Sequence, residues 1–442
     1  MRKTTLAWSA CAAALLPALA ATSAAADTPL TPAGALQMAG QAAASQQTAT
    51  SSATSTQDHP TNTAIHVAIL SPGASSGPVQ QANTSNATSA AGNTNTTSQD
   101  VAQSGGGAGA GSQTAGQQAQ SGQTAQSSAG STQDHPTNTA IHVAILSPGA
   151  SSGPVQQANT SNAGSQAGNT NTTRQRTTQS GGRGGGGVQA AGQAAGTAQR
   201  ADSTATSTQD HPTNTAIDVA ILSPADRRAV GGGIAADGLG HLAAPSGGVA
   251  QANTSNATSA AGNTNTTTQD VAQHGGGLAA PAFDGRSVCE TCSREALPTG
   301  SGVQAAGQLA GNEQAATSGA TSTQRGPLNL ALGGAGGAVQ QGNASSATSA
   351  AGNTNATAQR VRQAGAALMQ AVGQQALNGQ AADSHAASEQ VCPANVAAAA
   401  GPFAQANTSG AGSAAGNTNG TTQDAGQGFG PIGPVVLPLL RS

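Results

Sequence analysis

The sequence predicts a mainly β protein, a repetitive β-solenoid of strand–arc–strand coils joined by glycine-rich flexible linkers. Ten motifs recur in pairs, and within each motif every second residue is nearly fixed while the residues between them vary. A period of two is typical of a β-strand with one packed face. Leu, Ile, Val and Phe together make up roughly 12% of the residues and Tyr is absent, so a large apolar core is excluded. The alternative is a largely disordered low-complexity chain, in which sequence changes would accumulate equally at both sets of alternating positions.

The first element in chain order is a secretory signal peptide, residues 1–26. Arg2 and Lys3 precede a short apolar segment, and Ala24–Ala26 form an A-x-A cleavage site. We therefore expect a bacterial protein that is secreted or held at the cell surface. No later segment approaches the ~18 apolar residues of a membrane span. The net charge of −3 gives no electrostatic argument for a nucleic-acid partner.

The first kind of motif has glutamines at both ends and alternating Ala, Ser and Gln between them. Small fixed residues on one register predict a tightly packed strand face. The end glutamines of the five copies are Gln41 and Gln57, Gln117 and Gln133, Gln193 and Gln209, Gln308 and Gln324, and Gln374 and Gln390.

The second kind of motif runs over residues 81–99, and its fixed register includes Asn83, Asn93 and Asn95. Fixed amides on stacked copies predict hydrogen-bonded ladders from coil to coil. Gly92 is glycine in every copy and predicts a bend between two short strands, so each motif would be one coil of ten. The end glutamines are Gln81 and Gln99, Gln157 and Gln175, Gln251 and Gln269, Gln341 and Gln359, and Gln405 and Gln423.

A third element lies between the two motifs of each pair. Residues 64–70 read AIHVAIL, with Ile and Val alternating between a preceding proline and a following Pro-Gly, which predicts a short strand. It returns at 140–146 and 216–222, whereas the last two pairs keep only remnants at 327–332 and 392–396. Drift of this kind is typical of terminal repeats that act as caps.

These elements divide the mature chain into five repeat units separated by glycine-rich linkers. The predicted segments are unit 1 (37–103), unit 2 (113–178), unit 3 (189–273, with an inserted loop at 226–247), an inserted loop with the CETC motif (274–301), unit 4 (304–363), unit 5 (370–427) and an apolar tail (428–442).

The alternating Gln, Asn, Ser and Ala pattern, as in GNTNTTSQ at residues 92–99, resembles curlin-type repeats of exported bacterial functional amyloids. The resemblance covers the ten motifs, while the units here are longer and carry an additional Ile/Val strand. It implies stacked strand–turn–strand coils that form extracellular fibres, with self as the partner.

Few residues suggest chemistry. Cys289 and Cys292 have C-x-x-C spacing but no second pair for zinc, so a disulfide is favoured, within the pair or between chains, with Cys392 as an alternative partner. His59, His135 and His211 each follow Asp and precede Pro; turn positions are the plain interpretation, and a metal-binding column is the alternative. No catalytic or cofactor-binding motif is present, so we expect neither an enzyme nor a cofactor.

The sequence thus predicts a non-enzymatic structural or self-assembling component of the cell surface or extracellular matrix. The alternative is a surface-binding module, either an adhesin that uses the inserted loops or an ice-binding protein with outward rows of threonine such as Thr48, Thr50 and Thr54. The register argument also predicts that Ala87→Glu costs several kcal/mol of stability. Replacement of Thr88 should cost under about 0.5 kcal/mol.

Overall fold

The computed structural model describes residues 36–105, 111–147, 149–181, 187–221, 247–275, 302–333, 337–365, 369–398 and 401–429. These residues form fifteen strands and no helix, which confirms the predicted β-solenoid. The signal peptide, Cys289, Cys292, most of both inserted loops and nearly all of the tail lie outside the described residues.

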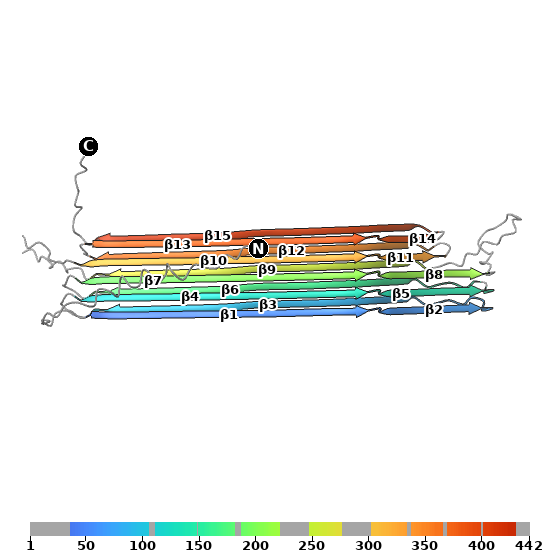
Figure 1. Cartoon of the computed structure of the whole chain (residues 1–442), viewed down its shortest axis with the longest axis horizontal. Helices are drawn as coiled ribbons and strands as arrows, with labels where there is room; N and C mark the ends of the chain where they lie inside the picture. The colour runs from blue at the N-terminus through green and yellow to red at the C-terminus, as the bar shows by residue number, and fades with distance from the viewer. Residues whose placement is uncertain are drawn as a thin grey trace, which may run out of the picture.

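Each coil contains a long outgoing strand, a short strand that continues in the same direction, and a long returning strand (Figure 1). The outgoing strands are β1 (Leu36–Asp58), β4 (Ser112–Asp134), β7 (Val188–Asp210), β10 (Val303–Arg325) and β13 (Met369–Val391). The short strands are β2 (Thr61–Ile69), β5 (Thr137–Ile145), β8 (Thr213–Ile221), β11 (Leu328–Leu332) and β14 (Ala394–Ala398). The returning strands are β3 (Val79–Ser104), β6 (Val155–Ser180), β9 (Val249–His274), β12 (Val339–Gly365) and β15 (Phe403–Phe429).

Equivalent strands of successive coils pair in parallel and form three five-stranded sheets, which we call the outgoing, short and returning sheets. Pairing follows the repeat letter by letter, so that Gln41 lies beside Gln117 and Asn83 beside Asn159. Parallel strands about 4.8 Å apart therefore place like residues in columns along the stack.

The expectation of ten coils is wrong, because five coils form and each uses both motifs. Strand β3 continues without a break through Gly92, so this glycine makes no bend. The outgoing and returning sheets pack face to face and form the two layers of the fold. A single motif therefore does not need to fold back on itself.

Small side chains fill the space between the two long sheets. Three clusters of alanines, two of them purely alanine and the third with Val271 and Val361, run along the stack. Beside the first of these clusters, Ser131 Oγ lies 2.9 Å from Ser85 Oγ and 2.8 Å from Ser161 Oγ, both on the opposite sheet. Each outgoing strand after β1 therefore lies opposite the gap between two returning strands, a stagger of half a coil.

The short sheet places its aliphatic residues outward. Ile65, Val67 and Ile69 are 64%, 52% and 55% exposed, while the residues between them face the interior. The inward positions hold Asn and Ala, together with His66 and His142, whose ring centroids are 5.0 Å apart. The last two coils keep the short strand, as β11 and β14, despite their divergent sequences.

Candidate self-assembly interface

The stack has two open ends. Strands β1, β2 and β3 form the first-coil edge, and β13, β14 and β15 form the fifth-coil edge; each is paired on one side only within the described residues. An edge strand presents a row of unpaired backbone N–H and C=O groups that can pair with another chain.

Neither edge carries the residues that usually block such pairing, which are lysines, prolines and inward-pointing charges. The six edge strands contain no Lys and no Pro. Their charged residues are Asp58 and Asp100 at the first-coil edge, and Asp383, Glu389 and Asp424 at the fifth-coil edge. Strands of 23 to 27 residues with so little charge are strong candidates for association.

The inward glutamines form ladders that all have the same direction. The amide nitrogen of each glutamine donates to the side-chain oxygen of the glutamine one coil earlier. In one column Gln133 donates to Gln57 at 2.7 Å, and Gln390 donates to Gln324 at 2.8 Å. In the returning sheet Gln157 donates to Gln81, and Gln423 donates to Gln359. In the inward ladders the glutamine donors therefore point toward the first-coil edge.

The inward asparagines form ladders with the opposite direction. Asn83 donates to Asn159 at 3.0 Å and Asn343 donates to Asn407 at 2.8 Å, so each donor points toward the next coil. The columns that begin at Asn93 and Asn95 follow the same rule. A fourth column, in the short sheet, runs from Asn62 to Asn395 with every bond at 2.9 Å.

The two edges are therefore complementary, column by column. The fifth-coil edge offers glutamine oxygens and asparagine N–H groups, while the first-coil edge offers glutamine N–H groups and asparagine oxygens. The side-chain oxygen of Gln370, in the fifth coil, is buried and has no hydrogen-bond partner in the described part of the chain. It lies in the column in which Gln113 donates to Gln37.

Because the two long sheets are offset by half a coil, the strands at each end of the stack are offset in the same way, and the two ends fit each other. Strand β15 lies beyond β13, and its inward as well as its outward residues are exposed. Ser409 Oγ contacts Ser388, whereas the equivalent Ser161 contacts serines on both sides. An outgoing strand placed next to β13 would cover this face, and β1 carries the matching inward residues.

The structure places every end glutamine of both motifs on the inward register, where those of the inner coils are buried. The asparagine column at position 62 was missed in the sequence. Its signal is the pattern P-x-N-x-A, which all five short strands share and which begins at Pro60, Pro136, Pro212, Pro327 and Pro393. The divergent residues around it in the last two copies hide it.

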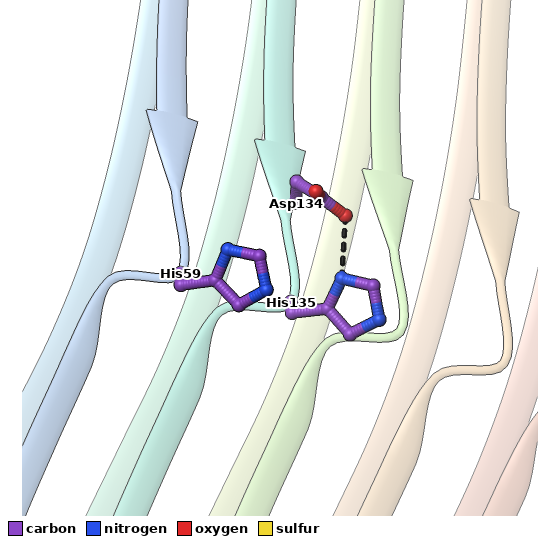
Figure 2. A group of neighbouring side chains, drawn as sticks. All are labelled: His59, Asp134 and His135. Carbon is purple, nitrogen blue, oxygen red and sulfur yellow. Dashed lines mark hydrogen bonds and ion pairs between the residues drawn. The ribbon is translucent and has the colours of Figure 1, made fainter.

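The corner between the outgoing and short strands has a left-handed backbone in every coil. His59, His135 and His211 have φ of 48°, 46° and 45°, and Gly326 and Cys392 occupy the same corner with φ of 54° and 50°. The three imidazoles do form a column, with ring centroids 5.0 and 4.9 Å apart. Figure 2 shows the first two of them. Glycine and histidine tolerate this conformation better than most residues, so the predicted turn role accounts for their position.

A scan against protein-family models, a search of curated proteins and a search of solved structures each found no match. In the described part of the chain, no helix has the length and apolar character needed to cross a membrane.

Proposed function

We propose that this protein is an exported, non-enzymatic structural component of the cell surface or matrix that assembles with copies of itself, end to end. The supporting observation is the opposite direction of the glutamine and asparagine ladders. Donors at one edge match acceptors at the other edge at each inward amide column that runs through all five coils. The resemblance of the motifs to curlin-type repeats supports the same function.

The matching edges favour a head-to-tail contact. If the fifth-coil edge of one copy receives the first-coil edge of the next, Gln390 lies beside Gln57 and Asn419 beside Asn95, as in the ladders within one chain. A head-to-head contact would run the edge strands antiparallel or pair different sheets, so equivalent columns would not meet. A head-to-tail contact leaves one open edge at each end of the assembly. When the rotation between successive copies does not close a ring, such contacts build a filament.

Asn419→Asp tests this proposal at one edge only. Asn355 donates to the side-chain oxygen of Asn419 at 2.8 Å, and an aspartate still accepts that bond. The substitution removes only the outward donor and places a carboxylate against the oxygen of Asn95 in the next copy. An unsatisfied buried pair costs about 2 kcal/mol, so we expect the critical concentration for assembly to rise at least about thirty-fold.

Asn86→Asp is the matched control. Asn86 faces outward on the first coil, and its oxygen accepts from Asn162 at 2.9 Å, so the same substitution keeps its internal bond. At the junction its neighbour would be Gly410, which has no side chain. Filament formation by mature protein from Asp27 onward is followed by light scattering and electron microscopy. Equal critical concentrations for the two variants, or wild-type protein that stays monomeric at all concentrations, would contradict the proposal.

A second candidate function is ice binding, favoured by one column on the outer face of the returning sheet. Thr94, Thr170, Thr264, Thr354 and Thr418 are all exposed and stacked in register. The threonine rows of the outgoing sheet are interrupted, for example by Gly130 and Arg200. Thermal hysteresis that is lost in Thr264→Lys and kept in Thr204→Lys, an outgoing-sheet control, would support this candidate. Absence of thermal hysteresis in the wild type would remove it.

A further inference from the structure

The corner column combines imidazoles with carboxylates from the first two coils. His59 Nδ1 lies 2.5 Å from Asp58 Oδ1, and His135 Nδ1 lies 2.6 Å from Asp134 Oδ1. Figure 2 shows the two imidazoles side by side, with Asp134 held against His135. The side chains of His59 and His135 are 65% and 47% exposed, so solvent ions reach them.

We propose that His59, Asp134 and His135 bind one divalent transition-metal ion, such as Zn²⁺. Each residue offers one ligand atom, and these atoms lie within 4.8 Å of one another. Imidazole nitrogen and carboxylate oxygen are ligands that suit zinc, with bonds of about 2.0–2.2 Å. Two ligands at the tetrahedral angle of one ion are thus about 3.4 Å apart, and rotations of the exposed side chains close the remaining gap. Water completes the coordination.

The fold brings these ligands together. The backbone N–H of His59 donates to the carbonyl of Asp134 at 2.8 Å, and this bond ties the corner of the first coil to that of the second. His59 and His135 are 76 residues apart in the chain. The metal therefore binds the stacked protein better than the unfolded chain, and it links the first-coil edge to the coil behind it.

The chain supplies its own conservative substitution for this site. Glycine occupies the same left-handed corner in the fourth coil, at Gly326, so His59→Gly and His135→Gly remove a ligand without straining the backbone. His211→Gly is the matched control, because it changes the same corner one coil beyond the proposed ligands. All variants carry serine at Cys289, Cys292 and Cys392, which removes thiol ligands.

Zinc binding to the mature chain is measured by titration calorimetry below the assembly concentration, together with the thermal unfolding midpoint. We expect about one ion per chain, a raised midpoint, and dissociation constants at least about thirty-fold weaker in His59→Gly and His135→Gly but nearly unchanged in His211→Gly. The proposal is overturned if the wild type binds no zinc. It is equally overturned if both ligand variants bind as tightly as wild type, as they would if the ion lay at the inner pair His66 and His142. Monomeric protein suffices, so this result is independent of self-assembly.

Discussion

The inward and outward registers of the same strands follow different rules. Inward residues such as Gln133 and Asn159 recur in every coil and bond to their equivalents above and below. Outward neighbours such as Thr124 vary, since Arg200 and Ala315 share its column. In most proteins the apolar residues are the buried ones, yet here Ile65 faces solvent while glutamine is fully buried. Burial in this fold therefore selects small size and a matched amide more than hydrophobicity.

The largest loss of stability should come from a charge placed in an inward alanine column. Ala205 is fully buried in the third coil between other alanines. Ala205→Glu should destabilise the protein by at least about 4 kcal/mol, because an unpaired carboxylate enters a tight interior. Thr204→Glu, one residue away on the outward register, should change stability by under about 0.5 kcal/mol. Thermal unfolding followed by circular dichroism compares them, and equal losses would mean that the two registers do not differ.

A smaller loss is expected when one ladder is interrupted. Gln209 donates to Gln133 at 2.8 Å and accepts from Gln324 at 2.7 Å. Gln209→Met keeps the volume but leaves a donor and an acceptor unpaired, at a cost of about 2–3 kcal/mol. The exposed Gln126→Met is the control and should be nearly neutral. Hydrogen exchange of the third coil reports the loss locally; unchanged protection in Gln209→Met would show that the ladders contribute nothing.

The smallest effect concerns the charges of the outward register at the junction. Asp100, Arg176, Asp270, Arg360 and Asp424 form one column of alternating sign, so head-to-tail copies bring two aspartates together. Asp100→Asn removes this repulsion, which is worth about 0.5 kcal/mol, and should lower the critical concentration roughly two-fold. Asp270→Asn, in the middle of the stack, should leave the critical concentration unchanged. The decrease caused by Asp100→Asn should vanish at high salt, and a decrease that persists there would exclude repulsion as its cause.

The alternation of fixed and varying residues was enough to predict a stacked β fold. It did not predict the size of the coil, because alternation ends neither at Gly92 nor at any other residue within a motif. The reversal of direction depends on the arc after the short strand. Leu70, whose φ is 51°, lies at its start, and a leucine carries no turn signal.

The candidate interface was only partly predictable. Ladders of Gln and Asn were expected from stacked amides, but a sequence contains no information on which way each amide donates. Many of these amides make a second hydrogen bond that holds the amide in one orientation, such as Gln117 to the carbonyl of Arg176 on the opposite sheet. The histidine column followed from the spacing of 76, while the nearness of Asp134 to His59 needed the corner geometry.

A disulfide that joins the two edges would test head-to-tail assembly most directly. Cys392 and His59 occupy the same corner of the last and first coils, so head-to-tail stacking places them one strand spacing apart, about 4.8 Å. This separation is within the range of a disulfide. His59→Cys, with serine at Cys289 and Cys292, is assembled and then oxidised. Head-to-tail stacking predicts covalent oligomers of increasing size linked between position 59 of one copy and Cys392 of the next, as mass spectrometry of the linked peptides would show. Dimers linked through two copies of position 59, or the absence of any link in assembled protein, would contradict it.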